Sequence, residues 1–291
     1  RPNPSRKDAD NSMRKEIVLP AATVAVGAAG FLLRRWELAT AFEPDTGLHI
    51  PGSPATWALI ALSAALAAAL VLLCRGKYPD FAGGYDQAFQ AKGNTLYATA
   101  MILSAFLLLA AAGGMVLSFL RRENTVVTRL ILAALCVACV VATTRNNFRG
   151  EGKGKYNFTL LMPAYTGCVW LIAAYQVRAG DPVQLDYIYE LFAIIAVLLG
   201  LYFNAGFSFE RGKPFRAVLC SLLGVYFSLV PLADGHDPAT TLLYGFAVVY
   251  LLSSTAVLLH NAARRPGAPM DPPEAEKAAE EEETEETPDE P

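Results

Sequence analysis

Two charged residues lie inside apolar segments of the chain, where ionised side chains are costly and therefore indicate function. Arg129 lies about one turn inside the outer end of the run 125–143, and Glu190 occupies the matching depth in the run 187–208. Opposite charges at the same depth predict an Arg129–Glu190 ion pair that lines an outer vestibule. The alternative is that both long side chains extend separately to the membrane surface.

A second set of polar side chains lies deeper. Tyr202 and Asn204 fall toward the inner end of the sixth apolar run, and Tyr165 and Thr166 follow Pro163 in the fifth. Proline removes a backbone donor and kinks a helix, and such kinks often border cavities. We expect these four polar residues and the two charged ones to be the ligand-binding candidates. A hydrogen bond to a neighbouring helix is the alternative role for Asn204.

The sequence carries no signature of catalysis or of a metal site. Cys136 and Cys139 form a CxxC on one helical face, but no second pair or histidine stands at ligand spacing, so packing residues are expected. His49 and His236 lie in separate segments and offer two ligands where a metal needs three or four. HExxH and GxSxG motifs are absent. We expect no catalytic residue, no metal and no cofactor, and an intramembrane enzyme is the least favoured class.

A basic, glycine-rich stretch at residues 149–155 superficially resembles a phosphate-binding loop. It lacks the GxxxxGK[ST] spacing, and Tyr156 stands where a serine or threonine belongs. The stretch instead predicts attraction to anionic lipid headgroups at the cytoplasmic face, worth about 1 kcal/mol per basic residue near the surface. We expect no nucleic acid among the partners.

These residues are positioned by apolar runs that are long enough to cross a lipid bilayer. Of the 291 residues, 54% are hydrophobic. A helix that spans the hydrocarbon core needs about 20 apolar residues, and backbone groups in lipid must be satisfied within the segment. The sequence therefore predicts an all-α fold, a polytopic integral membrane helix bundle with about eight transmembrane helices. The runs are 16–33, 56–74, 95–120, 125–143, 158–177, 187–208, 215–233 and 239–260.

The distribution of lysine and arginine predicts the orientation in the membrane. With both termini in the cytoplasm, the inner segments hold 18 basic residues and the outer segments hold six. The positive-inside rule then favours N-in/C-in, in the plasma membrane. A seven-helix topology is the alternative, because basic residues precede the first run and small residues occupy 25–30, as in a signal peptide.

Polar segments flank the membrane domain, residues 16–262, on both sides. Residues 1–15 form a polar N-terminal segment, and Met13 looks like a natural start, so residues 1–12 are expected to be added sequence. Residues 263–291 are expected to be a disordered acidic tail, with eleven acidic residues and one lysine from Asp271 onward. The rest of the chain has 23 basic and 16 acidic residues. The tail could therefore bind a basic protein partner or the protein's own basic inner face.

Two connecting loops are expected to have defined structure. Residues 34–55 are rich in turn-forming residues and predict an ordered outer cap. Residues 78–93 carry four aromatics on one helical stripe, which predicts a short interfacial helix on the cytoplasmic leaflet. The aromatic residues are Tyr78, Phe81, Tyr85 and Phe89. Gly83 and Gly84 favour the alternative, an irregular loop.

Small residues recur at four-residue spacing in the second and third runs. They include Ala61, Ala65 and Ala69, and also Ala110 and Gly114. Such faces let helix backbones approach closely, so we expect them in the tight core of the bundle.

Two classes of function fit these features. The first is a small-molecule carrier or permease-like protein, which the helix count and the polar residues near Pro163 and Asn204 favour. The alternative is a non-transporting membrane sensor or an assembly or scaffold protein, which the scarcity of deep polar residues favours. The two differ in whether Asn204, Tyr165 and Thr166 line a water-accessible cavity near mid-membrane.

Overall fold

The computed structural model describes residues 6–43, 45–46, 48–75, 78–79, 81, 83–90, 95–122, 126–149, 157–178, 183–209 and 212–263. The acidic tail after Ala263 and nearly all of the basic stretch 149–155 lie outside these residues. The helices are α1 (Arg6–Thr40), α2 (Pro54–Cys74), α3 (Tyr85–Ala88), α4 (Thr95–Leu120), α5 (Val127–Arg149), α6 (Asn157–Arg178), α7 (Gln184–Ala205), η1 (Gly206–Phe209), α8 (Pro214–Leu229), η2 (Val230–Asp234) and α9 (Pro238–Ala263).

Eight helices in the described part of the chain are long and apolar enough to cross a membrane. They coincide with the eight apolar runs and confirm an all-α, polytopic membrane helix bundle. Their spans are Ile17–Thr40, Pro54–Cys74, Thr95–Leu120, Val127–Thr144, Phe158–Arg178, Tyr187–Phe209, Pro214–Asp234 and Pro238–Ala263. The main difference is in α1, which continues to Thr40 and not to residue 33. Two charged residues of its last turns, Arg34 and Glu37, are therefore helical and buried inside the protein, whereas Arg35 is exposed.

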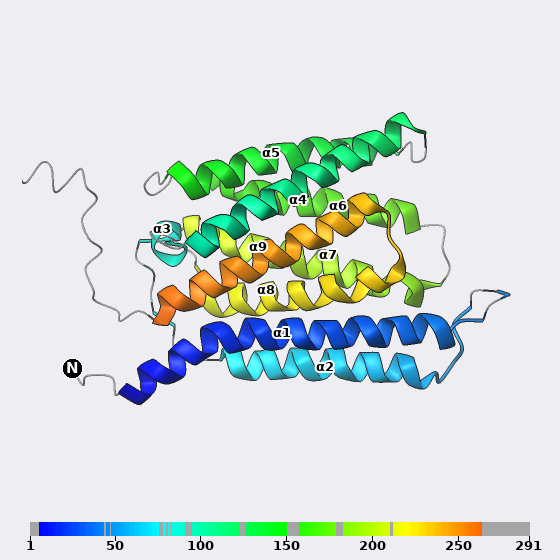
Figure 1. The fold of residues 1–291 in the computed structure, drawn as a ribbon, viewed down its shortest axis with the longest axis horizontal. Helices are drawn as coiled ribbons and strands as arrows, with labels where there is room; N and C mark the ends of the chain where they lie inside the picture. Colours follow the sequence, from blue (N-terminus) through cyan, green and yellow to red (C-terminus); the bar gives the residue numbers. More distant parts are fainter. Residues whose placement is uncertain are drawn as a thin grey trace, which may run out of the picture.

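Six of the helices form a closed ring in which each packs against the next along the chain, from α4 to α9, and α9 returns to α4. Outside this ring, α1 packs against α8, η2 and α9, and α2 packs against α1 and α8 (Figure 1). The beginning of α1 and the end of α9 lie at the same end of the bundle, which we call the terminal end. We call the opposite end the far end.

Large apolar and aromatic side chains fill the interior of the ring. Leu108, Ile194 and Tyr244 are fully buried there, and Tyr250 lies among them. Cys136 and Cys139 are buried in the same cluster as free thiols, the packing role expected from the sequence. Protein interiors packed in this way leave few voids that could hold water.

The aromatic residues between α2 and α4 pack against other parts of the protein, which favours the irregular loop over the interfacial helix expected there. Among the described residues of 78–93, Tyr85–Ala88 is the helical part, and Tyr85 and Phe89 are buried. The rings of Phe81 and Phe89 contact Phe207 of η1 at centroid distances of 5.7 and 5.4 Å. Asn261 of α9 donates hydrogen bonds to the carbonyl oxygens of Ala88 and Gln90. These contacts form a cap at the terminal end.

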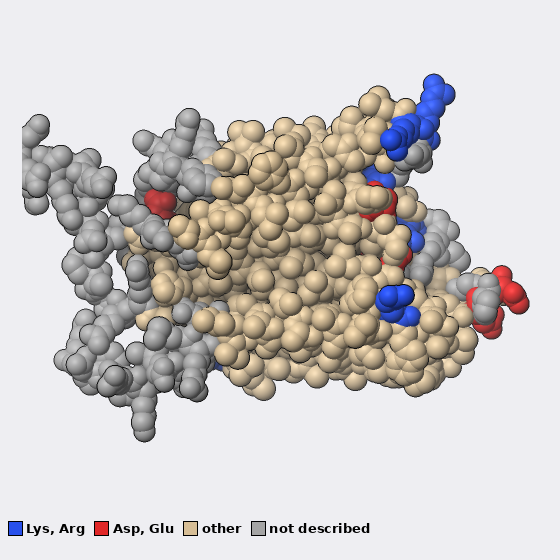
Figure 2. All heavy atoms as spheres, in the orientation of Figure 1, with Lys and Arg blue, Asp and Glu red and all other residues tan. Residues whose placement is uncertain are grey.

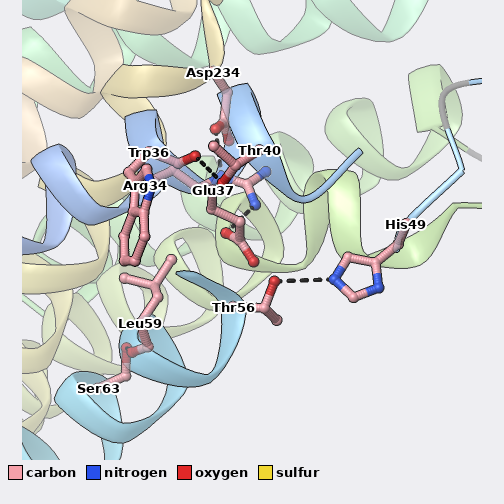
Figure 3. Close-up of polar contacts among 9 residues, drawn as sticks. All are labelled: Arg34, Trp36, Glu37, Thr40, His49, Thr56, Leu59, Ser63 and Asp234. Carbon is pink, nitrogen blue, oxygen red and sulfur yellow. Dashed lines mark hydrogen bonds and ion pairs between the residues drawn. The ribbon is translucent and has the colours of Figure 1, made fainter. Parts of the chain in front are cut away.

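The loop between α1 and α2 is ordered by hydrogen bonds, as its turn-forming residues predict. The amides of Glu43 and Ile50 donate to the carbonyl oxygens of Leu48 and Ala41, at 2.9 and 2.8 Å. The ring of His49 packs edge-on against Phe42 and hydrogen bonds to Thr56 Oγ1 of α2 at 2.9 Å (Figure 3). This loop joins the far ends of the two helices.

The prediction that the small residues of α2 lie in the tight core of the bundle is wrong. Ala61 and Ala65 are exposed on the side of α2 that faces away from the bundle, and not in the tight core expected for them. Leu59, Leu66 and Leu70 occupy the buried face instead, because α2 is the peripheral helix. In α4, Ala110 is also exposed and not in the core, but the close approach does occur at Gly114, where an added Cβ would lie 3.2 Å from Ala239 of α9.

Candidate functional site

A cavity of about 270 Å³ opens into the ring at the far end. Its floor is apolar and its upper wall is charged. The residues that line it are Met115, Arg129, Leu132, Trp170, Ala173, Ala174, Val177, Arg178, Glu190, Asp234, Gly235, His236, Asp237, Thr240 and Leu243. Charged side chains gather at this end of the molecule, whereas the middle of the bundle is free of them on the face in view (Figure 2).

The first ion pair of the cavity joins α5 to the start of α9. Asp237 directly precedes α9, and a carboxylate at this position is stabilised by the positive end of the helix dipole and can accept hydrogen bonds. Pro238 suits the first position of the helix. Arg129 Nη2 donates to Asp237 Oδ2 at 2.7 Å and to Thr240 Oγ1 at 3.2 Å. Thr240 Oγ1 donates to Asp237 Oδ1 at 2.6 Å. The hydrogen bond from Thr240 thus fixes the position of the Asp237 carboxylate, and the Asp237 carboxylate in turn binds the guanidinium of Arg129.

The pKa of Asp237 lies below the ordinary value for an aspartate. Burial of the carboxyl raises its pKa. The hydrogen bonds from Thr240 and Arg129, together with the positive charge of Arg129, lower the pKa by more than burial raises it. Asp237 therefore remains ionised throughout the physiological pH range.

The second ion pair joins α6 to α7. Arg178, in the last turn of α6, donates from Nε to Glu190 Oε2 at 3.2 Å. Its guanidinium also lies 5.9 Å from the centre of the Tyr187 ring. Only 6% of Glu190 is exposed, so its carboxylate is largely removed from water. The 3.2 Å contact is longer than a typical charge-assisted hydrogen bond, and Glu190 is consequently the least tightly engaged carboxylate in the wall.

The third group of charges is behind the cavity wall and joins α1 to η2. Arg34 is fully buried and donates from Nε to Asp234 Oδ1 at 2.7 Å and from Nη1 to Glu37 Oε2 at 2.8 Å (Figure 3). Its guanidinium also lies 5.4 Å from the centre of the Tyr189 ring. Asp234 lines the cavity, so this buried group connects α1 to the site. We call Arg34, Glu37 and Asp234 the buried triad.

The two charged residues expected at the site both line the cavity, but each has a different partner. Arg129 pairs with Asp237, and Glu190 pairs with Arg178. The expected Arg129–Glu190 ion pair is therefore wrong, because the two residues belong to two separate ion pairs that line the same cavity.

The other four candidates do not line this cavity. Tyr165 and Tyr202 are about half exposed on the lateral surface of the bundle. Thr166 is buried and donates to the carbonyl oxygen of Met162, one turn earlier in α6, at 2.9 Å. Asn204 is buried, and its Nδ2 has no hydrogen-bond partner among the described residues. The structure thus separates these four residues from Arg129 and Glu190.

Several residues of the site escaped prediction from the sequence. Arg34 follows the first apolar run directly, with Glu37 three positions later, which is the spacing of an intrahelical ion pair. Asp234, His236 and Asp237 lie at the turn before α9, between the seventh and eighth apolar runs. The Asp237-Pro238 step was the available signal, since it marks the start of a helix. Trp170 and Arg178 carried no signal that distinguished them from other residues near a helix end.

The two histidines considered as metal ligands from the sequence have different surroundings. His236 lines the cavity, whereas His49 forms a hydrogen bond with Thr56 of α2. Within the described residues no group of three or more His, Cys, Asp and Glu side chains converges as a metal site. Paired charges above an apolar floor can recognise a small molecule that has both polar and apolar parts.

Comparison with protein-family models, with curated proteins and with solved structures found no match to this chain. The assignment of function therefore rests on the geometry of the far-end cavity.

Proposed function

We propose that the protein is a plasma-membrane sensor that binds a small polar molecule from the outer side, in the far-end cavity. The observation that carries this proposal is the cavity itself, which is lined by paired charged side chains together with apolar ones. The side chains of Asp237 and Arg178 are 37% and 25% exposed, so the wall is accessible from the far end. The excess of basic residues in the segments at the terminal end supports both termini being cytoplasmic.

Sensing is favoured over transport by what lies below the cavity. The interior of the ring beneath it is filled by buried side chains such as Tyr244, Leu108 and Tyr250. Tyr165, Thr166 and Asn204, the residues on which a transport path was expected to depend, do not line the cavity. A carrier would need polar groups that continue toward the terminal end, so a bound molecule is expected to remain in the site.

The cytoplasmic side supplies the output in this proposal. The acidic tail would bind a basic protein partner, and the basic stretch 149–155 would bind anionic lipid headgroups. The lipid bilayer is the environment of the eight spans.

The binding step is tested with full-length protein in lipid nanodiscs, by thermal unfolding against a panel of amines, carboxylates, amino acids and sugars. A molecule that binds the native state raises the unfolding temperature, and the rise grows with ligand concentration. Ala174→Leu places a larger side chain in the cavity wall and is expected to abolish the rise. Ala110→Leu makes the same change on an exposed face of α4 and is expected to leave it intact.

The choice between sensor and carrier is tested by flux. Protein reconstituted in proteoliposomes is given the radiolabelled form of any compound that stabilises it. Binding without uptake above protein-free vesicles supports the sensor. Uptake that Ala174→Leu blocks and Ala110→Leu does not would establish the carrier function instead.

A further inference from the structure

We infer that the ligand of the far-end cavity is a small organic cation, an amine with a short apolar body. This inference rests on the proposed function and specifies its ligand. It follows from the size of the cavity, the balance of charge around it, and the arrangement of its carboxylates and aromatic rings.

The size of the cavity limits the ligand. A volume of 270 Å³ equals that of roughly nine water molecules at about 30 Å³ each. This is just below the usual range for sites that take drug-sized ligands, which begins at about 300 Å³. A molecule of roughly ten non-hydrogen atoms fills it, whereas a sugar phosphate or nucleotide does not fit.

The charges around the cavity are unequal. The side chains of its ion pairs are three arginines and four carboxylates: Arg34, Arg129, Arg178, Glu37, Glu190, Asp234 and Asp237. The described set therefore holds one carboxyl group more than it holds arginines. Within the buried triad one arginine faces two carboxylates, and Glu37 Oε1 is buried without a hydrogen-bond partner among the described residues. A net charge held away from water favours an incoming opposite charge.

Glu190 is the carboxylate that a cation would contact. Asp234 and Asp237 each accept a 2.7 Å hydrogen bond from an arginine, whereas the contact between Arg178 and Glu190 is 3.2 Å long. The side chain of Arg178 is partly exposed at the mouth and can turn toward water. An ammonium group with three donors can replace that contact at the wall.

The lower part of the cavity suits the apolar body of an amine. Trp170 lines it, with the ring of Tyr244 behind at a centroid distance of 5.2 Å. A tryptophan face attracts cations through its quadrupole, and the neighbouring Leu132 and Leu243 accept hydrocarbon. The site thus pairs one carboxylate with an aromatic and aliphatic pocket.

The test compares four probes that share a phenyl ring and differ in charge: benzylamine, benzyl alcohol, benzoate and phenylglycine. Binding to the full-length protein in nanodiscs is measured by calorimetric titration at neutral pH. Benzylamine is expected to bind saturably and at least tenfold more tightly than the other three. Tighter binding of benzoate or phenylglycine overturns the cation inference and leaves the proposed function standing. If none of the four binds, the cation inference fails, whereas the proposed function fails only if the wider panel of amines, carboxylates, amino acids and sugars also gives no binding.

Two variants locate the binding. Glu190→Gln keeps the shape of the side chain and is expected to weaken benzylamine binding at least tenfold, whereas Glu43→Gln, in the exposed far-end loop, is the matched control. Ala174→Leu reports on the cavity even if Glu190→Gln does not fold, because it blocks the space without changing charge. Unchanged benzylamine binding in either cavity variant contradicts the inference.

Discussion

Arg34 is the residue whose environment is most demanding. A fully buried guanidinium is tolerated only when carboxylates surround it with good geometry. Glu37 supplies one from the same helix, and Asp234 supplies another from η2. The buried triad therefore ties α1 to the ring at the far end. Its value lies in specifying that position, because ion pairs away from water contribute little net stability.

The buried triad predicts a contrast between partial and complete removal. Arg34→Met leaves two buried carboxylates without their cation, and is expected to lower the free energy of unfolding by about 3–5 kcal/mol. The triple variant Arg34→Met, Glu37→Met, Asp234→Leu replaces all three charges with apolar groups and is expected to recover most of that loss. Unfolding in mixed detergent micelles measures both. A triple variant no more stable than the single one would contradict this account.

Asp237 predicts a pH dependence whose sign follows from its lowered pKa. A carboxyl with a lower pKa in the folded state contributes stability above its unfolded value, near 3.8, and loses it as pH falls through the folded value. Asp237→Asn keeps a good helix-capping residue and removes the charge. The stability difference between wild type and variant should be constant from pH 5 to about 8 and shrink below about pH 4. Thermal unfolding across this range measures it, and a difference that persists unchanged to pH 3 would exclude the role given to Asp237.

At the scale of helices, close backbone approach determines how the ring is packed. A Cβ added at Gly224 of α8 would lie 2.7 Å from Leu251 Cδ1 and 3.3 Å from the backbone of Val197. The Leu251 side chain would have to move, and the backbone of α7 at Val197 would have to give way by a few tenths of an ångström, in a core that is already packed. By contrast, nothing lies within 4 Å of a Cβ added at Gly113 of α4.

These two glycines predict opposite results for the same substitution. Gly224→Ala is expected to destabilise the protein by about 1–3 kcal/mol through overpacking. Gly113→Ala is expected to be neutral or to stabilise it by up to about 1 kcal/mol, because alanine is the better helix former. Equal effects of the two changes on the unfolding temperature would show that the α7–α8–α9 contact is looser than described.

The helices could be predicted from the sequence, because the need for about 20 apolar residues per span is a local property. The partners of the charged residues could not. The depth of Arg129 and Glu190 placed them correctly at one end, but which carboxylate meets Arg129 depends on how α5 is rotated against α9. The prediction that the alanines of α2 lie in the core was wrong for the same reason. Their four-residue spacing places them on one helix face, but it does not say whether that face contacts lipid or a neighbouring helix. Phe207, which buries the aromatics before α4, lies more than 100 positions away in the sequence.

At the scale of the whole molecule, the orientation is the property to measure. We expect the far end to face outward, because the basic residues gather in the segments of the terminal end. In a cysteine-free background, Thr46→Cys in the far-end loop should react with a membrane-impermeant maleimide on intact cells. A tag appended after Pro291 should be detected only once the cells are permeabilised. The reverse pattern would place the cavity in the cytoplasm.

The buried triad also has a consequence for how the protein is made. Arg34 and Asp234 are 200 positions apart in the chain. At about 5–20 residues per second, roughly 10–40 s separate their synthesis. During that interval α1 can already be in the bilayer, while η2 does not yet exist. Glu37 is the only member of the triad then available, and its position on the same helix means that Arg34 enters the membrane already paired.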